Sequence, residues 1–173
     1  GCGGGEGNQS CKIARCSMEH GRPEYCNECQ EYPCETYEGI DAFDSFITHY
    51  NQKKDLEKRQ RIGGPAYQEE QREKADILRH LLENYNDGRK KSFYCLAVNL
   101  LELEDLKAVI GQAEEIGKAQ KIGQAEEIGK ARKAGREDEP GGLTLKESAA
   151  CVAGLLRKMA DEKQIVLKLR KKR

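Results

Sequence analysis

The sequence predicts a mostly α-helical protein, with a small cysteine-rich N-terminal module on a helical body and one short C-terminal strand. Two observations lead to this prediction. Six of the eight cysteines fall near the N-terminus, in a polar stretch with few aliphatic side chains, at Cys2, Cys11, Cys16, Cys26, Cys29 and Cys34. Further along, apolar residues recur at offsets of three and four, as on one face of an amphipathic helix. The predicted domains are residues 1–38, 39–109, 110–142 and 143–173.

Thiols packed this densely in a Gly-rich stretch need something other than a hydrophobic core to hold them, and a metal ion is the best candidate. Structural zinc takes four tetrahedral ligands, and cysteines spaced by two to four residues can reach the same ion. Residues 26–29 and residues 11–16 each begin and end with such a cysteine, and Cys2 and Cys34 lie close enough to exchange with them. We therefore expect residues 1–38 to form loops and short turns around a stabilising metal.

The same thiols allow other interpretations. An iron–sulfur cluster also uses four thiolates, but the spacing does not reproduce the contiguous ferredoxin runs and the neighbouring residues are polar. Disulfide or redox pairing is a further alternative. His20 could serve as a zinc ligand, although an exposed loop histidine is the simpler interpretation where cysteine is in surplus.

Two helices are predicted between the cysteines and residue 90. Asp41 can be the N-cap of the first, because apolar side chains at offsets of three and four occur over residues 43–50. The triplet Gly63-Gly64-Pro65 should end this helical segment. A long amphipathic helix follows over residues 67–85.

Two further helices and a strand are predicted in the C-terminal half. Ser92 can cap a helix that reaches Leu101 and then continues or restarts near Leu103. Residues 144–147 have the spacing of a capping box in front of another amphipathic helix. Residues 164–170 alternate between an apolar and a mixed side, which is typical of a short strand.

Residues 110–133 contain an internal duplication. The segment Ile-Gly-Gln-Ala-Glu-Glu-Ile-Gly-Lys-Ala begins at Ile110 and again at Ile122, and its finer unit is a hexad that opens with Ile-Gly. Six residues turn an α-helix by about 600°, so no single face collects the isoleucines, and the repeated glycines weaken a helix further. We expect a solvated linker or a frayed helix over residues 110–142, with partner binding as the alternative.

The charges and hydropathy exclude some classes of function. Lys plus Arg and Asp plus Glu each total 30, so no global field draws the chain to nucleic acid or membranes. No stretch approaches a membrane span, and the N-terminus lacks the basic and apolar regions of a signal peptide, so the cytoplasm is the expected location. The basic segments 89–91 and 168–173 could contact phosphates, although solvated charge is the ordinary interpretation.

No residue pattern predicts an enzyme. The sequence has no phosphate-binding glycine motif and no nucleophile elbow, and its histidines, His20, His49 and His80, are scattered. Cys95 and Cys151 lie in apolar helical stretches, where cysteine usually packs as a small buried hydrophobe.

Three segments resemble the signature of a cysteine-rich prokaryotic domain family of unknown function: Cys-Lys-Ile-Ala-Arg-Cys at 11–16, Tyr-Cys-Asn-Glu-Cys at 25–29 and Glu-Tyr-Pro-Cys-Glu at 31–35. A fainter likeness runs through residues 87–96 and 165–172. Family members usually carry an earlier cysteine-bearing segment, which this sequence lacks. The resemblance implies zinc binding and transfers no catalytic residue. The metal ligands that it implies are Cys2, Cys11, Cys16, Cys26, Cys29 and Cys34.

The sequence therefore predicts a zinc-binding protein of unknown cellular role, in which the metal is structural and the helical body is a scaffold for a protein partner. All-cysteine zinc sites are normally closed to substrate, which fits this interpretation. The alternative is a thiol redox or metal-handling protein that uses Cys26 and Cys29. A nucleic-acid-binding zinc module, with residues 168–173 as its basic tail, is the third possibility.

Overall fold

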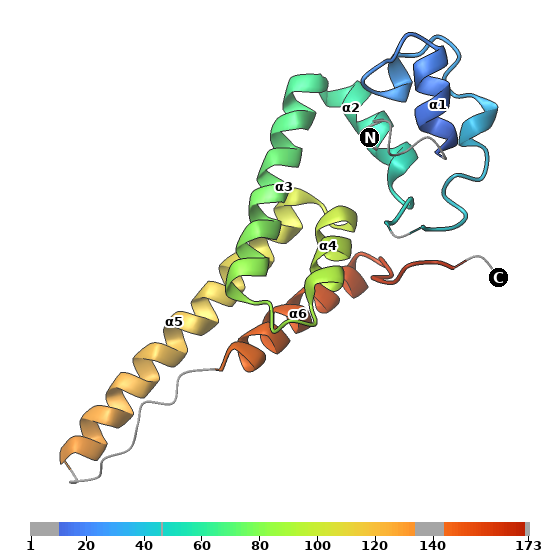
Figure 1. The fold of residues 1–173 in the computed structure, drawn as a ribbon. Coiled ribbons are helices and arrows are strands. Elements are labelled where there is room, and N and C mark those ends of the chain that lie inside the picture. The colour runs from blue at the N-terminus through green and yellow to red at the C-terminus, as the bar shows by residue number, and fades with distance from the viewer. Residues whose placement is uncertain (1–10, 46, 134–143, 172–173) are drawn as a thin grey trace. The chain divides into compact units, whose positions relative to one another are not determined.

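The computed structural model describes residues 11–45, 47–133 and 144–171, with the side chains of residues 120–133 left out (Figure 1). The chain divides into two compact units. The first takes residues up to Glu69 together with those from Leu169 onward, and the second is Glu70–Lys168. The regular elements of the described residues are all helices, which confirms the mostly α-helical prediction. None of the helices in these parts of the chain combines the length and hydropathy that a membrane-spanning segment needs.

The cysteine-rich part of the first unit contains more helix than the sequence predicts. Helix α1 spans Lys12–Glu19 and buries Ala14, and two 3₁₀ turns follow, η2 at Cys26–Glu28 and η3 at Glu35–Tyr37. After α1, Gly21 has a φ of +81°, a left-handed conformation that glycine adopts without steric cost. The chain can therefore reverse direction directly behind the helix and return toward it.

The helix predicted from Asp41 over residues 43–50 is wrong. The described residues of this segment, all but Phe46, form a loop, and α2 begins only at Gln52 and ends at Ile62. The carboxylate of Asp44 accepts hydrogen bonds from the backbone N–H of His49, at 2.8 Å, and from the hydroxyl of Thr48, at 3.3 Å. Such side-chain bonds to nearby groups compete with the helical ladder. The predicted break is confirmed, since α2 ends where Gly63 takes a φ of +85°.

The second unit holds most of the hydrophobic core. Its helices are α3 (Gly64–Asn84, which begins in the first unit), α4 (Lys91–Leu100), α5 (Leu103–Lys133) and α6 (Leu145–Glu162). Figure 1 shows α6 lying along the first part of α5, and α4 also contacts α6. The largest fully buried side chains all come from these helices or their ends: Tyr94, Leu81, Leu101, Leu106, Leu156, Val109 and Val152.

Tyr94 carries a polar group into this core. Its hydroxyl donates to the backbone carbonyl of Tyr85, at 2.9 Å, and lies 3.4 Å from that of Ala149 in α6. Burial, together with the nearby charge of Asp87, raises the pKa of Tyr94 to about 12. The phenol therefore stays protonated and remains a hydrogen-bond donor.

Several helix boundaries match the sequence signals, and one cap differs. The helix predicted over residues 67–85 is present as most of α3, and Thr144 forms the predicted capping box with Glu147 at the start of α6. The N-cap of α4 is Lys90 rather than Ser92. The duplicated segment continues α5 as helix to Lys133, while residues 134–142 of the predicted linker lie outside the described residues.

The strand predicted over residues 164–170 is wrong, and no strand occurs among the described residues. The alternation has another cause. Ile165 and Leu167 pack against the hydrophobic core while Val166 is 74% exposed, and the N–H of Lys168 bonds back to the carbonyl of Val166. One side of the segment is thus buried without the neighbouring strand that a sheet requires.

The expected burial of Cys95 is also wrong. Helix α4 turns Tyr94, Ala97 and Val98 into the core, and Cys95 falls outside this face and is exposed. Cys151 in α6 is half-buried.

Candidate functional site: a cavity lined by four cysteines

Four cysteines from three short elements of the first unit line one small cavity. Cys16 comes from α1, Cys26 and Cys29 begin and follow η2, and Cys34 precedes η3. Each of these thiols is half-buried. The cavity measures about 20 Å³, enough for one ion or one water molecule. Its other lining residues are Ile13, Ser17, His20, Pro23, Tyr32, Thr36 and Tyr37.

The cavity brings together four of the six predicted ligands. Cys11 does not line it, because this residue is the N-cap of α1 and precedes Cys16 by more than one helical turn. Cys2 lies outside the described residues. Cys34 also lines the cavity, because it directly precedes the turn η3. The spacing of the cysteines alone favours the pairs at 11–16 and 26–29 over Cys34.

The thiols are close enough to influence each other electrostatically. Burial raises the pKa of the Cys16 thiol, and the neighbouring charge of Cys34 and, to a smaller extent, of Cys29 and Cys26 raises it further, against a hydrogen bond with Thr36 that lowers it. Like charges so close together disfavour ionisation of the Cys16 thiol. A cation between the sulfurs would reverse that balance, because metal ions bind the deprotonated thiolate.

Two tyrosines support the cavity. Tyr37 is only 5% exposed, and its ring packs edge-on against that of Tyr32 with 5.1 Å between the ring centroids. Burial raises the pKa of Tyr37, and a hydrogen bond between its hydroxyl and Cys26 raises it further. A neutral tyrosine that donates to a cysteine sulfur stabilises and orients a thiolate.

His20 is exposed, as the simpler interpretation of the sequence expects, and as the C-cap of α1 it lies beside the thiols in the cavity lining. Its Nδ1 lies 2.8 Å from the carbonyl oxygen and 3.6 Å from the Sγ of Cys16, and its Nε2 lies 3.2 Å from a carboxylate oxygen of Glu31. The hydrogen bond to the Cys16 backbone, followed by the charge of Glu31, raises the pKa of His20. Both ring nitrogens face acceptors, so the protonated form is favoured.

The chemistry of this set of donors fits zinc, although the side chains do not lie at bonding positions. Among the residues that the structure describes, no three or more His, Cys, Asp or Glu side chains form a group that could hold a metal ion as they lie. Binding would therefore require the four sulfurs to turn toward one another. Four thiolates are a common donor set of structural zinc.

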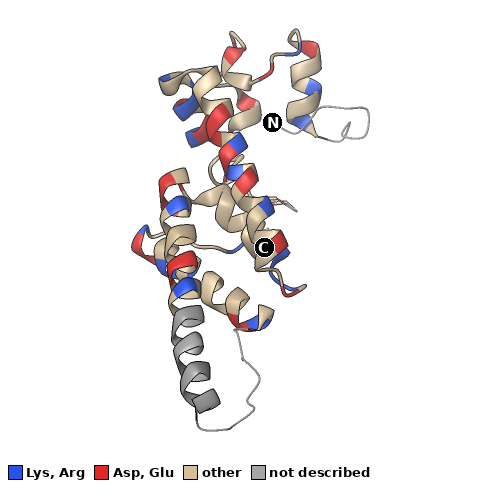
Figure 2. Cartoon of the chain, turned by 90° about the vertical axis from the view of Figure 1, so that its left-hand side faces the viewer, with Lys and Arg blue, Asp and Glu red and all other residues tan. Residues whose placement is uncertain are grey.

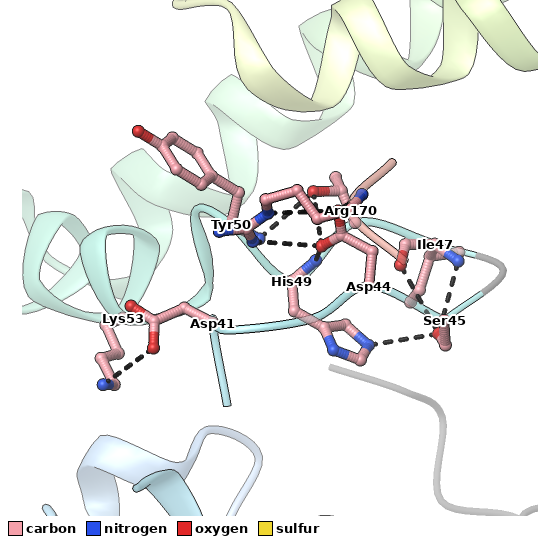
Figure 3. A network of polar contacts seen from close by, with 9 residues as sticks. Asp41, Asp44, Ser45, Ile47, His49, Tyr50, Lys53 and Arg170 are labelled. Carbon is pink, nitrogen blue, oxygen red and sulfur yellow. Dashed lines mark hydrogen bonds and ion pairs between the residues drawn. The ribbon is translucent and has the colours of Figure 1, made fainter. Parts of the chain in front are cut away.

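A second polar centre in the same unit fastens the C-terminal segment to the loop before α2 (Figure 3). The Asp44 side chain is only 1% exposed and accepts from the backbone N–H of Arg170, at 2.7 Å, and from its guanidinium, at 3.2 Å. The Arg170 guanidinium also lies over the ring of Tyr50, 4.7 Å from the ring centroid. Arg170 of the basic tail is therefore engaged within the protein rather than free to meet phosphates.

Charge elsewhere is mixed in sign. Figure 2 shows acidic and basic residues interspersed along the same helices. In the basic segment 89–91, Lys90 is paired with Asp87 at 3.1 Å. This distribution gives little support to a nucleic-acid interface.

Comparison of the chain with family models, with curated proteins and with solved structures finds no match.

Proposed function

We propose that the first unit is a zinc-binding module in which the metal is structural, and that the second unit is a scaffold for a protein partner. The observation that supports zinc binding is the convergence of Cys16, Cys26, Cys29 and Cys34 on one cavity. These residues come from three short elements that are separated by loops. The proposal extends to a reducing compartment, the cytoplasm, because dense unpaired thiols are typical there.

The small core of the first unit supports a structural role for the metal. Its buried apolar side chains, among the described residues, are Ala14, Tyr37, Leu56 and Tyr67. Small units with so little buried surface usually need a metal or disulfides to fold. When bound, zinc supplies bonds that tie the elements together, and four thiolates leave no open coordination position for a substrate.

The proposal is tested by elemental analysis of protein purified under reducing conditions, combined with serine variants. We expect about one zinc ion per chain, since four thiolates complete a tetrahedral site. Cys34→Ser should lower the zinc content. Cys11→Ser is the matched control from the same unit, and it should retain zinc because Cys11 does not line the cavity. Cys95→Ser, which changes an exposed thiol of the second unit, should also retain it.

Other outcomes would contradict the proposal. Freshly isolated, reduced protein that is free of metal while residues 11–38 are ordered would exclude a structural zinc. Iron and sulfide with a visible absorption band would indicate an iron–sulfur cluster instead. Loss of zinc in Cys11→Ser with retention in Cys34→Ser would assign the site to the pairs at 11–16 and 26–29.

The alternative, thiol redox or metal transfer, rests on Cys26 and Cys29, which are half-buried and occupy the two ends of one tight turn. Thiol labelling of zinc-loaded protein separates the two functions. A structural site protects these cysteines until a chelator is added, whereas rapid labelling without chelator would favour redox or transfer chemistry.

A further inference from the structure

We infer that Arg59 of α2 is the positioning residue for Cys26 and Cys29, and that metal binding at the cysteine cavity is coupled through it to the docking of α2. This inference rests on the proposed zinc site. It assigns a role to a helix that contributes no residue to the cavity lining.

One guanidinium contacts most of the turn that carries the two cysteines. Nη1 of Arg59 donates to Oδ1 of Asn27, at 3.1 Å, and Nη2 forms an ion pair with Glu28. Its Cζ lies over the ring of Tyr25, 4.0 Å from the ring centroid. Asn27 and Glu28 are the two residues between the cysteines, and Tyr25 directly precedes them. The guanidinium is therefore bound to the turn through three side chains.

The same side chains also shape the turn itself. The carboxylate of Glu28 accepts from the backbone N–H of Tyr25, at 3.2 Å, and the N–H of Cys29 bonds to the carbonyl of Cys26, at 3.1 Å. Asn27 donates to the backbone carbonyl of Leu56 in α2, at 3.1 Å. Contacts on the outside of the turn thus fix its backbone, and the backbone determines where the two thiols can point.

The turn and α2 depend on each other, because α2 has little apolar surface of its own to hold it in place. Leu56 is the only buried residue of this helix. A helix of this length is marginal in water without tertiary contacts. A metal that orders the turn should therefore also stabilise α2, and loss of the Arg59 contacts should weaken the metal site by the same coupling.

The test uses the full chain and compares two arginine-to-alanine variants in α2. Arg59→Ala removes all three contacts, whereas Arg61→Ala, two positions away, changes an exposed arginine of the same helix. Zinc affinity is measured by competition, and cobalt is titrated as a spectroscopic probe of thiolate coordination. Removing groups that orient metal ligands typically weakens binding by about 10- to 100-fold, which is the loss expected for Arg59→Ala. Arg61→Ala should bind as the wild type does.

Two further measurements separate positioning from general destabilisation. Arg59→Lys keeps the positive charge. A lysine ammonium, however, has no planar group that can donate to two acceptors at its edge while it stacks on an aromatic ring by its face, so zinc affinity should stay below that of the wild type. In wild-type protein, added zinc should slow hydrogen exchange in peptides that cover residues 52–62, and Arg59→Ala should lose this response. Glu28→Gln, which keeps the size of the side chain, should weaken zinc binding in the same direction.

The outcomes distinguish this inference from the proposed function. If the wild type binds no metal, the zinc site itself is wrong. If the wild type binds zinc and Arg59→Ala binds it equally well, with exchange in α2 indifferent to metal, the coupling is refuted while the zinc site stands.

Discussion

Replacing Asp44 by asparagine should release the C-terminal segment from the first unit. The Asp44 carboxylate is almost completely buried and receives hydrogen bonds from Arg170, His49 and Thr48 (Figure 3). The substituted asparagine would keep the size of the side chain but lose the charge, and its amide would place N–H groups against donors. The change therefore removes the ion pair with Arg170. It also leaves some of the surrounding N–H donors without an acceptor at a buried site, where water cannot replace the lost hydrogen bonds.

The expected magnitude follows from the pKa of Asp44. Burial alone would raise this pKa, but hydrogen bonds from the Arg170 side chain and backbone and from the His49 backbone outweigh it and lower the pKa from 3.8 to about 2. Since one pH unit of pKa difference corresponds to about 1.4 kcal/mol, the ionised carboxylate stabilises its folded surroundings by roughly 2 kcal/mol. That stabilisation is fully present above pH 3.8 and is lost as the pH falls toward 2.

Hydrogen exchange in peptides that span residues 41–50 measures the effect locally. At pH 7 the Asp44→Asn variant should exchange about thirtyfold faster, which corresponds to roughly 2 kcal/mol. Asp41→Asn is the matched control, because the ion pair of Asp41 with Lys53 lies near the surface, where such pairs contribute little. Below pH 3.8 the difference between wild type and Asp44→Asn should shrink.

Two results would contradict this role of Asp44. Exchange in Asp44→Asn that matches the Asp41→Asn control would mean that the buried carboxylate does not hold the loop. A difference from wild type that persists unchanged at about pH 2 would mean that the charge of Asp44 is not its source.

Two predictions concern the second unit. Tyr94→Phe removes the donor that serves the carbonyls of Tyr85 and Ala149, and it should lower the free energy of unfolding by about 1–2 kcal/mol in urea denaturation. Thr144→Ala removes the acceptor for the backbone N–H of Glu147 and should cost about 1 kcal/mol, measured by circular dichroism during thermal unfolding.

Each of these changes has a control in the same chain. Tyr50→Phe deletes the hydroxyl of an exposed tyrosine and should leave stability almost unchanged. Lys146→Ala substitutes an exposed position in the first turn of α6 with a residue of similar helix propensity. Equal effects of Tyr94→Phe and Tyr50→Phe, or of Thr144→Ala and Lys146→Ala, would contradict the assigned roles of Tyr94 and Thr144.

Local signals predicted the helices of the second unit because the residues that determine them lie close together in sequence. The capping box at residues 144–147 and the apolar repeat of 67–85 are examples. The loop over residues 43–50 also has a helical repeat, yet Asp44 takes a partner, Arg170, that lies 126 residues away. No local pattern contains that information. At residues 165–167 the alternation correctly indicated one buried side, but it could not show that no strand among the described residues lies beside it.

The sequence predicted that the candidate site consists of N-terminal cysteines, but it did not predict which four of them line the cavity. The spacing of Cys26 and Cys29 identified a pair that the structure does bring to one cavity. Cys11 and Cys16 resemble a second pair only if the chain between them is a turn. That chain is α1, and five residues rotate a helix by about 500°, so the two side chains point well away from each other. The place of Cys34 depends on η3, whose short turn has no clear signal in the sequence.

The long separation between Asp44 and Arg170 has a consequence for synthesis of the chain. At roughly 5–20 residues per second, a ribosome that has added Asp44 needs on the order of ten seconds to reach Arg170, 126 positions later. The four cysteines of the cavity and all of α2 emerge before that interval ends. Metal capture can therefore begin on the nascent chain, whereas the loop around Asp44 can reach its final shape only after Arg170 has been made.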